Sequence, residues 1–374
     1  MKLSEIVQRI NGNIDRFTTE LEFYIGGEHM ESSELEISNR GLLKENLGKL
    51  GFKFHFAFQE RDVLFMARNP HLRKAGMVMF SGLCSDATYV LRSKDENIIS
   101  QEFLAIQLQT DHFWDYCERT KVGSVNFANN WSSIANYDFD LPPINIQKEV
   151  ASKVWSAYRV KQSYRKLLNA IDDMVKSQFI EMFGNGNWEH KTLGEVGSFK
   201  RGGGFQKSDF VELGIPCIHY GQIHTRFGPF IYSHLTDISS DLESKTKFAE
   251  KGDLIIAITS EDTEGSCKST AWLGDYPVAV GGHAAIFHHC MNPVYMSFFF
   301  KSALFNYAKR EYVHGTKVCE IKPDDIAKIF VPCPPISLQE DFSMIAQQAD
   351  KSKFELKKSI EAIDKVIKSL INNI

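Results

Sequence analysis

The sequence has little of what marks secreted, zinc-binding or membrane proteins. Its 7 cysteines are scattered and never form a Cys-x-x-Cys pair, so we expect neither a disulfide framework nor a structural zinc site. No uncharged apolar run approaches the ~20 residues that span a bilayer, and the first residues do not join a basic flank to an apolar stretch. We therefore expect a protein of the reducing cytoplasm that is neither exported nor inserted into a membrane.

Proline is also scarce, with 11 in 374 residues, while 43% of the residues are hydrophobic and 24% are charged. This composition is typical of a folded chain rather than a disordered one, and the length suggests about two domains. The net charge of −4 gives no general attraction to nucleic acid. Any contact with DNA must therefore come from a local basic patch.

Motifs of catalysis are missing as well. The stretch Arg201–Gly204 is not followed by the Gly-Lys-Ser/Thr of a phosphate-binding loop, and the chain has no Asn-Pro-Pro-aromatic or Asp-Pro-Pro-aromatic tetrad to hold a flipped base. Ile286-Phe287, in an expected strand, separates His283 from His288 and His289, so these histidines point in different directions. We expect no catalytic, cofactor or metal site in this chain.

A nuclease-like set of charges is better explained by helix structure. Asp324 and Asp325 are followed by Glu355-Leu356-Lys357, which superficially matches an acid and Glu-x-Lys pattern. Leu356, however, continues a heptad pattern of apolar residues, so its two neighbours are expected to be solvated charges on a helix.

What the chain does contain is a long internal repeat. The passage Pro142-Pro143-Ile144-Asn145-Ile146-Gln147 returns 192 residues later as Pro334-Pro335-Ile336-Ser337-Leu338-Gln339, and further identities follow it. A Pro-Pro pair holds the backbone extended and cannot lie inside a helix, so a helix should start just after each pair. Asn145 and Ser337 are the expected N-caps.

A heptad pattern follows each Pro-Pro pair, since apolar residues recur in alternating steps of four and three. In the first copy they are Val150, Val154, Ala157, Tyr164, Leu168, Ile171, Val175 and Met182; in the second they are Phe342, Ala346, Ala349, Leu356, Ile360, Ile363, Ile367, Leu370 and Ile374. Lys161 and Lys353 interrupt the same position of the two patterns. We expect the two helices to form an antiparallel coiled coil within the chain. The alternative is that each helix packs only on its own domain.

The segments before the two helices share a pattern of short strands and aromatic-rich helices. Strand-like runs are expected at residues 62–67, 87–91, 253–258 and 284–287, and helical runs at 103–114 and 295–307. The sequence therefore predicts an α/β (α+β) protein with an internal pseudo-two-fold repeat. Its parts are a globular domain at 1–140, a long helix at 141–186, a second globular domain at 187–333 and a second long helix at 334–374.

This organisation resembles the specificity subunit of Type I restriction-modification systems. Besides the repeat, the resemblance rests on Gly214–Ile223 (GIPCIHYGQI), Phe199–Phe205 (FKRGGGF) and Gly252–Thr259 (GDLIIAIT). It implies two target-recognition domains that each read half of a split DNA site, and helices that hold them apart and dock methyltransferase subunits. In the first globular segment, Tyr24–His29 matches the Gly214–Ile223 stretch only loosely.

The resemblance also implies which partners and cofactors to expect. The partners are double-stranded DNA, methyltransferase subunits and, in the larger complex, restriction/translocase subunits. S-adenosylmethionine, ATP and Mg would belong to those partners and not to this chain.

Residues for contacting DNA can be named in both globular segments. Arginine and asparagine bind guanine and adenine edges through two hydrogen bonds, and lysine or arginine can contact phosphates. The expected DNA-binding residues are Arg68, Asn69, Arg73 and Lys74 in the first segment, and Lys200, Arg201, Lys207, Tyr220, Gln222, Arg226 and Lys268 in the second. The turn that holds the first four matches the Thr259–Lys268 loop, and the glycines after Arg201 should let backbone amides approach phosphates. For each residue, an ordinary solvated position is the alternative.

Two other functions remain open at this point. One is a self-contained DNA methyltransferase or nuclease, which needs the motifs that are missing. The other is a structural adaptor that binds two identical partners and never contacts DNA, because a two-fold repeat alone does not prove DNA binding.

Overall fold

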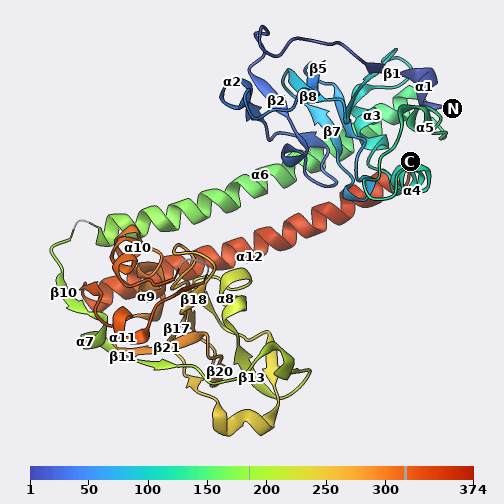
Figure 1. Cartoon of the computed structure of the whole chain (residues 1–374). Helices are drawn as coiled ribbons and strands as arrows, with labels where there is room; N and C mark the ends of the chain where they lie inside the picture. Colours follow the sequence, from blue (N-terminus) through green and yellow to red (C-terminus); the bar gives the residue numbers. More distant parts are fainter. Residues whose placement is uncertain (185, 316–317) are drawn as a thin grey trace. The chain divides into compact units, whose positions relative to one another are not determined.

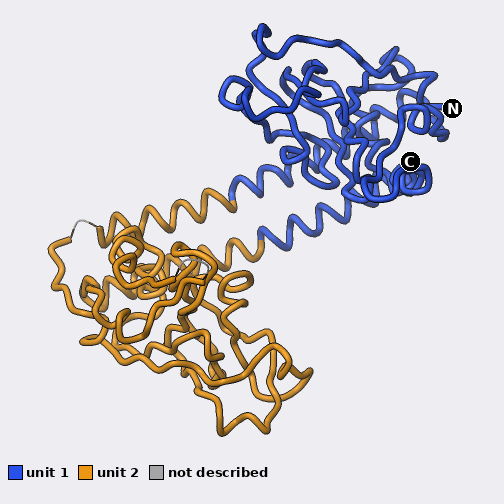
Figure 2. The backbone as a smooth tube through the Cα atoms, in the orientation of Figure 1, with its two compact units in different colours: residues 1–167, 356–374 blue, residues 168–355 orange. Residues whose placement is uncertain are grey.

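The computed structural model describes residues 1–184, 186–315 and 318–374. Contacts divide these residues into two compact units, of which unit 1 comprises 1–167 and 356–374 and unit 2 comprises 168–355. Figure 2 shows that both long helices change colour partway along their length. Each unit therefore consists of one globular segment and one part of each long helix.

Unit 1 contains two sheets. The first has the strand order β1-β9-β6-β7-β3 and the second β4-β2-β8-β5. Their bounds are β1 (Val7–Ile10), β2 (Phe23–Ile25), β3 (Glu36–Ile37), β4 (Gly41–Leu42), β5 (Phe54–Phe58), β6 (Val63–Met66), β7 (Ala75–Val78), β8 (Gly82–Ser85) and β9 (Thr88–Ser93). The helices are α1 (Leu3–Ile6), η1 (Gly27–His29), α2 (Leu43–Asn46), η2 (Pro70–Leu72), α3 (Gln101–Gln107), α4 (Asp111–Thr120) and α5 (Trp131–Ala135).

Unit 2 contains two main sheets of five strands each, with the orders β11-β21-β17-β19-β14 and β12-β15-β13-β20-β16. Their strands are β11 (Gly197–Arg201), β12 (Phe210–Val211), β13 (Ile215–Ile218), β14 (Phe230–Ile231), β15 (Thr236–Ile238), β16 (Phe248–Ala249), β17 (Leu254–Ala257), β19 (Ser269–Trp272), β20 (Val278–Val280) and β21 (Ala284–His289). Two further pairs are β10 (Glu189–Thr192) with β23 (Phe330–Cys333), and β18 (Thr259–Ser260) with β22 (Cys319–Glu320). The helices are α7 (Leu193–Val196), η3 (Lys207–Asp209), α8 (Tyr220–Thr225), η4 (Ser240–Lys245), α9 (Pro293–Phe299), α10 (Ala303–Ala308), η5 (Lys309–Glu311) and α11 (Pro323–Ile326).

The duplication extends through the globular segments strand by strand. In both units the first sheet ends on a parallel pair, β3 with β7 and β14 with β19, while its other pairings are antiparallel. Backbone hydrogen bonds also recur, because the N–H of Met77 donates to Leu35 and that of Ala271 donates to Pro229. These bonds give a residue-by-residue correspondence that the divergent sequences do not show.

The central strand of each first sheet is apolar throughout because both its faces are covered. In β6, Val63 and Phe65 join the core beneath the helices, whereas Leu64 and Met66 join the core between the two sheets. In β17 the same alternation separates Leu254 and Ile256 from Ile255 and Ala257. Side chains alternate along a strand, so each strand contributes to two cores. The predicted strands at 62–67 and 253–258 are therefore confirmed, with bounds one residue shorter at each end.

The predicted aromatic-rich helices are each broken into two. The first run forms α3 and α4, and the second forms α9 and α10. The break comes at a new N-cap, because the side chain of Thr110 accepts from the N–H of Phe113 and that of Ser302 accepts from the N–H of Phe305. A cap of this kind starts a new helix in a different direction.

The two long helices, α6 (Ile144–Phe183) and α12 (Ile336–Asn372), are continuous (Figure 1). Within unit 2 they run antiparallel, because Lys353 pairs with Asp172 while the earlier Phe342 contacts the later Phe179 and Phe183. In unit 1 the corresponding pair is Lys161 with Asp364, at 2.7 Å. The expected antiparallel helix pairing is confirmed, and the two lysines that interrupt the heptads are its ion-pair positions. Among the described helices, none is long and apolar enough to cross a membrane.

The expected N-caps are wrong, because the helices begin at Ile144 and Ile336 and so include Asn145 and Ser337. The repeated glutamine fixes each start instead. Gln147 donates to the carbonyl of Pro142 and accepts from the N–H of Ser100, the N-cap of α3. Gln339 likewise donates to Pro334 and accepts from the N–H of Asn292, the N-cap of α9. Both glutamines are buried, so each joins a long helix to its globular core.

A buried group of charges joins the globular part of unit 1 to its helices. Glu34, which is 7% exposed, accepts from Lys161 at 3.0 Å and from Arg165 at 2.9 Å. Burial alone would raise the pKa of Glu34, but the positive charges of Lys161 and Arg165 outweigh it, and the pKa lies below its usual value. The ionised carboxylate therefore stabilises the folded state.

Replacing this carboxylate should destabilise unit 1 in a pH-dependent way. Glu34→Gln leaves the Lys161 ammonium without its buried partner, so the free energy of unfolding should fall by about 3 kcal/mol at neutral pH. Because the folded-state pKa is lowered, the contribution of Glu34 is complete above the ordinary value of 4.5 and is lost as the pH falls through the lowered one. The difference between the two proteins should therefore shrink in acid.

Urea-dependent hydrogen exchange of peptides from residues 1–167 and 356–374 would measure this stability for unit 1 alone. The exposed Glu20→Gln is a matched control. Equal destabilisation by the two variants, or a gap independent of pH, would contradict the assignment of Glu34 as an ionised anchor.

Candidate nucleic-acid interface

The first set of expected DNA-binding residues lies on an ordered turn after β6. Asn69 and Arg73 flank η2, and both have left-handed backbones, with φ of 53° and 47°. The N–H of Asn69 donates to the carbonyl of Phe127, and that of Arg73 donates to Pro70. A left-handed backbone is uncommon for a residue with a side chain and persists where the surroundings hold it. The turn therefore presents its side chains from a fixed backbone.

Within this turn only part of the polar chemistry is available to a ligand. Arg73 forms an ion pair with Asp111 at 2.5 Å, and Lys74 donates to the carbonyl of Gly27 at 2.7 Å. The hydrogen bond from Arg73, with a contribution from the charge of Lys368, lowers the pKa of Asp111. Arg68 is exposed, and among the described residues its guanidinium has no hydrogen bond or ion pair. Arg68 and Asn69 are thus the residues free to contact bases.

The basic glycine loop of unit 2 differs from expectation. The amides of Gly202 and Gly203 already donate to the carbonyls of Ala284 and Val280. A Cβ on Gly202 would lie 2.3 Å from the carbonyl oxygen of Gly281, so these glycines serve close backbone packing. The prediction that their amides are open to phosphates is wrong, because the neighbouring strand uses them.

The cations beside this loop remain at the surface. Lys200 and Lys207 are exposed, while Arg201 donates to the carbonyl of Gly282 and pairs with Glu320 at 3.1 Å. Arg226 is exposed at the C-terminal end of α8, and Lys268 is exposed at the residue before β19. Lys268 corresponds to Lys74, since the carbonyls of both accept from the end of the preceding central strand, at Ala257 and at Met66.

Gln222 is a structural residue of helix α8. Its side chain accepts from the N–H of His219 and donates to the hydroxyl of Thr236, so both ends of the amide are engaged. His29 holds the same position in unit 1, where it accepts from the N–H of Gly26. This pairing supports the loose sequence match between the two segments, although it leaves Gln222 with little to offer a base.

Tyr220 lies in a group of imidazoles that sequence reasoning missed. Its ring centroid is 4.5 Å from that of His219, 5.1 Å from His283 and 6.0 Å from His224. These histidines come from the α8 region and from the segment before β21, so only the fold brings them together. The signal in the sequence was their polar character at the ends of apolar runs.

The hydrogen bonds fix how two of these imidazoles meet a ligand. His224 Nε2 lies 3.0 Å from the carbonyl of Thr259, which can only accept, so Nε2 carries the proton and Nδ1 is left as an acceptor. His219 Nδ1 accepts from the N–H of Gly221, which leaves Nε2–H as a donor. Burial, and then the charges of His283 and Lys207, lower the pKa of His219 and keep it neutral. The group offers a donor, an acceptor and an aromatic ring, as base recognition requires.

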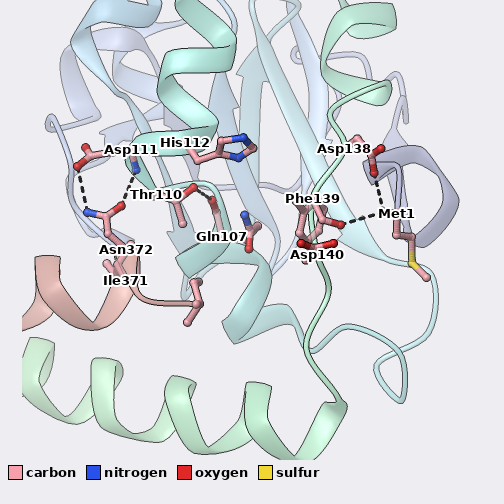
Figure 3. A pocket seen from close by; sticks show the side chains of 11 residues that line it. Met1, Gln107, Thr110, Asp111, His112, Asp138, Phe139, Asp140, Ile371 and Asn372 are labelled. Carbon is pink, nitrogen blue, oxygen red and sulfur yellow. Dashed lines mark hydrogen bonds and ion pairs between the residues drawn. The ribbon is translucent and has the colours of Figure 1, made fainter.

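One cavity of unit 1 lies where the end of α12 meets the start of α4 (Figure 3). It has about 640 Å³ and is lined by Asp111, His112 and Asp138, with the last turn of α12 at its side. Asn372 accepts from the N–H of Asp111 at 2.7 Å and donates to its carboxylate at 3.0 Å. The end of α12 is thereby tied to the start of α4. Among the described residues, no group of three or more His, Cys, Asp or Glu side chains could hold a metal ion.

The fold is duplicated, and its two α/β units carry similar loops with different residues. Comparison with known proteins shows what the chain is similar to. Residues 1–171 match the Type I restriction modification DNA specificity domain. The chain is 21% identical over 260 residues to the Type I restriction enzyme MjaVIII specificity subunit of Methanocaldococcus jannaschii, covering 63% of this chain and 61% of that protein. The chain is thus similar to Type I restriction-modification specificity subunits, by the family model over its first 171 residues and by the curated relative over less than two thirds of that protein.

Solved structures show the same fold along almost the whole chain. The S subunit of a Type I system from M. genitalium has a TM-score of 0.56 at 12% identity, covering 99% of this chain and 94% of that one. A chain from a study of complex assembly and conformational transition of the type I R-M system has a TM-score of 0.58 at 17% identity, with coverages of 99% and 95%.

The two arginines of the unit 1 turn should respond differently to replacement. Arg73→Ala breaks the pair with Asp111 and should lower the unfolding free energy by about 0.5 kcal/mol, a small value because both side chains are more than a third exposed. Arg68→Ala removes no contact and should leave stability unchanged. Hydrogen exchange at the start of α4 measures both variants. An equal loss in both would show that Arg68 has a structural role.

Proposed function

We propose that this chain is the sequence-specific DNA-recognition subunit of a Type I restriction-modification complex. Each globular part, at residues 1–140 and 187–333, reads one half of a bipartite DNA site. The long helices, within 141–186 and 334–374, provide the spacing and dock methyltransferase subunits. The observation that carries the proposal is the duplication of one fold with different polar side chains on the matching loops, because a reader of two unlike half-sites needs this combination.

The complex, rather than this chain, supplies the chemistry. Methyltransferase subunits bring S-adenosylmethionine, and restriction/translocase subunits bring ATP and Mg. The chain itself is non-catalytic and acts in the cytoplasm, where it binds DNA. Arg68 and Asn69 read bases in one half-site, and the group around Tyr220 reads them in the other. Lys200, Lys207 and Arg226 supply nearby cations for phosphates.

The adaptor hypothesis is the less favoured alternative. An adaptor for two identical partners needs two identical surfaces, whereas the loop that carries Arg68 and Asn69 in unit 1 corresponds to one with Glu261, Asp262 and Glu264 in unit 2. A difference of this size in charge fits two readers of different sequences.

The complex reconstituted with its methyltransferase subunit should methylate adenine in a split motif. We expect single-molecule sequencing of methylated genomic DNA to reveal two specified half-sites separated by an unspecified spacer. A continuous motif would argue against two readers, and methylation by the purified chain alone would favour a self-contained enzyme.

Exchanging one recognition domain should change one half of the motif only. A chimaera in which residues 1–140 come from another specificity subunit should keep the half-site read by residues 187–333. The matched control exchanges residues 187–333 and should alter the other half. A chimaera that changes both halves would show that the two domains do not read independently.

A further inference from the structure

Four lysines of unit 2 gather near one point, where the globular part meets the two helices. We call Lys176, Lys268, Lys301 and Lys353 the lysine cluster. Lys353 pairs with Asp172 at 2.8 Å, and Lys176 and Lys301 line one cavity of about 550 Å³. Lys268 and Lys353 both act electrostatically on Lys301. Like charges repel, so a cluster of this kind needs anions nearby.

At the equivalent place in unit 1, carboxylates of the same unit supply those anions. Lys161 and Lys368 are the repeat partners of Lys353 and Lys176, and they lie in a cavity of about 320 Å³ that also holds Glu34 and Asp111. Glu34 pairs with Lys161, and Asp111 lies 3.6 Å from Lys368. Each lysine of this cavity therefore has a carboxylate partner within unit 1.

The repeat identifies what replaces these carboxylates in unit 2. Matching hydrogen bonds align Leu35 with Pro229, so Glu34 corresponds to Gly228. Likewise the matching N-caps Thr110 and Ser302 align Asp111 with Ala303. Both carboxylates are thus missing at their equivalent positions in unit 2.

The same alignment shows that unit 2 has a positive charge where unit 1 has a neutral side chain. The neutral Gln109, which donates to the carbonyl of Glu34 at 3.0 Å, corresponds to Lys301. Among the described residues, the ammonium of Lys301 has no hydrogen bond or ion pair. The displacement of water by surrounding protein, followed by the charges of Lys353 and Lys268, lowers the pKa of Lys301 to about 8.

Acidic residues nearby compensate only in part. Asp173 pairs with Lys176 at 3.5 Å on an exposed part of α6. Asp350 is the repeat partner of Tyr158. Its charge raises the pKa of Tyr232 after the effect of burial, and among the described residues it forms no ion pair with the lysine cluster. Among the described residues, Asp172 is the one carboxylate with a close contact to Lys353, and Lys301 has none. Unit 2 therefore holds a lysine without a carboxylate partner, whereas both lysines at the equivalent place in unit 1 have one.

The chemistry of the site favours a polyanion over a single acidic side chain. One carboxylate would neutralise one lysine, whereas a nucleic-acid backbone offers successive phosphates to several. Lys268 is exposed, and Lys301 also reaches the solvent although protein surrounds much of its side chain. Lys268 directly follows the loop that corresponds to the Arg68 turn. Lysine binds phosphate as a flexible point charge and needs no fixed orientation.

We propose that Lys268, Lys301 and Lys353 bind backbone phosphates of the DNA in the half-site read by unit 2, and that unit 1 has no such contact at the equivalent place. The inference rests on the proposed function and adds an asymmetry to it. The two half-sites contribute unequally to the salt dependence of binding.

Two substitutions copy the chemistry of unit 1 into unit 2. Gly228→Glu introduces the missing carboxylate at a position with room for a side chain, since the nearest atom to an added Cβ is 3.9 Å away. Lys301→Gln introduces the residue of unit 1. Matched controls are Gly48→Glu, at an exposed glycine with nothing within 4 Å, and Lys328→Gln, at an exposed lysine paired with an aspartate.

The measurement is the affinity of the reconstituted complex for its duplex between about 50 and 200 mM salt. Each of the two variants should reduce the slope of log affinity against log salt by about one and weaken binding on all sequences, leaving the methylated motif unchanged. The controls should keep the wild-type slope.

The other outcomes separate the possible failures. Unchanged slopes in a complex that still binds its split site would overturn the phosphate contact alone. Weaker assembly with the methyltransferase subunit, with an unchanged slope in the complex that still forms, would assign the lysine cluster to an acidic protein partner and overturn the phosphate contact as well. A wild-type complex with no sequence-specific DNA binding would overturn the proposed function and this inference together.

Discussion

The structure depends on the antiparallel pairing of the two long helices, because neither globular core is complete without both. In unit 1, Val154 of α6 and Ile367 of α12 share one core with the helices that cover the first sheet. In unit 2 the same holds for Phe179 of α6 and Phe342 of α12. Part of the long helix of each copy thus packs in the core of the other copy. The exchange explains why the heptads, the Pro-Pro pairs and the buried glutamines are the parts that remain alike.

Outside this shared framework the two copies are free to differ, and they do so in charge. Glu34 neutralises Lys161 in unit 1, whereas Gly228 leaves Lys353 and Lys301 without that carboxylate in unit 2. The loops after the central strands diverge in the same way. A duplicated fold with a common helical framework can therefore acquire a new specificity on one side without loss of stability on the other, since each loop lies on a sheet whose two faces are already packed.

The features of the fold that could be predicted are those that follow from periodic patterns in the sequence. The two long helices, the central strands and the duplication follow from heptads, apolar runs and repeated motifs, and these expectations were confirmed, whereas the breaks in the aromatic-rich helices were not predicted. The sequence could not predict that Gln222 and the amides of Gly202 and Gly203 are used by their own backbone neighbours, or that Arg73 pairs with Asp111. Such contacts join residues far apart in the chain, and no local pattern encodes them. The group of Tyr220, His224 and His283 was missed for the same reason.

In the proposed function, the paired helices set the spacing between the two half-sites that one chain reads. Once the motif is known, the most direct test is the affinity of the reconstituted complex for duplexes whose spacer is lengthened or shortened by single base pairs. We expect tight binding at one spacing and a steep loss on either side, because each added base pair moves and rotates one half-site relative to the other. Affinity that is independent of the spacing would contradict the claim.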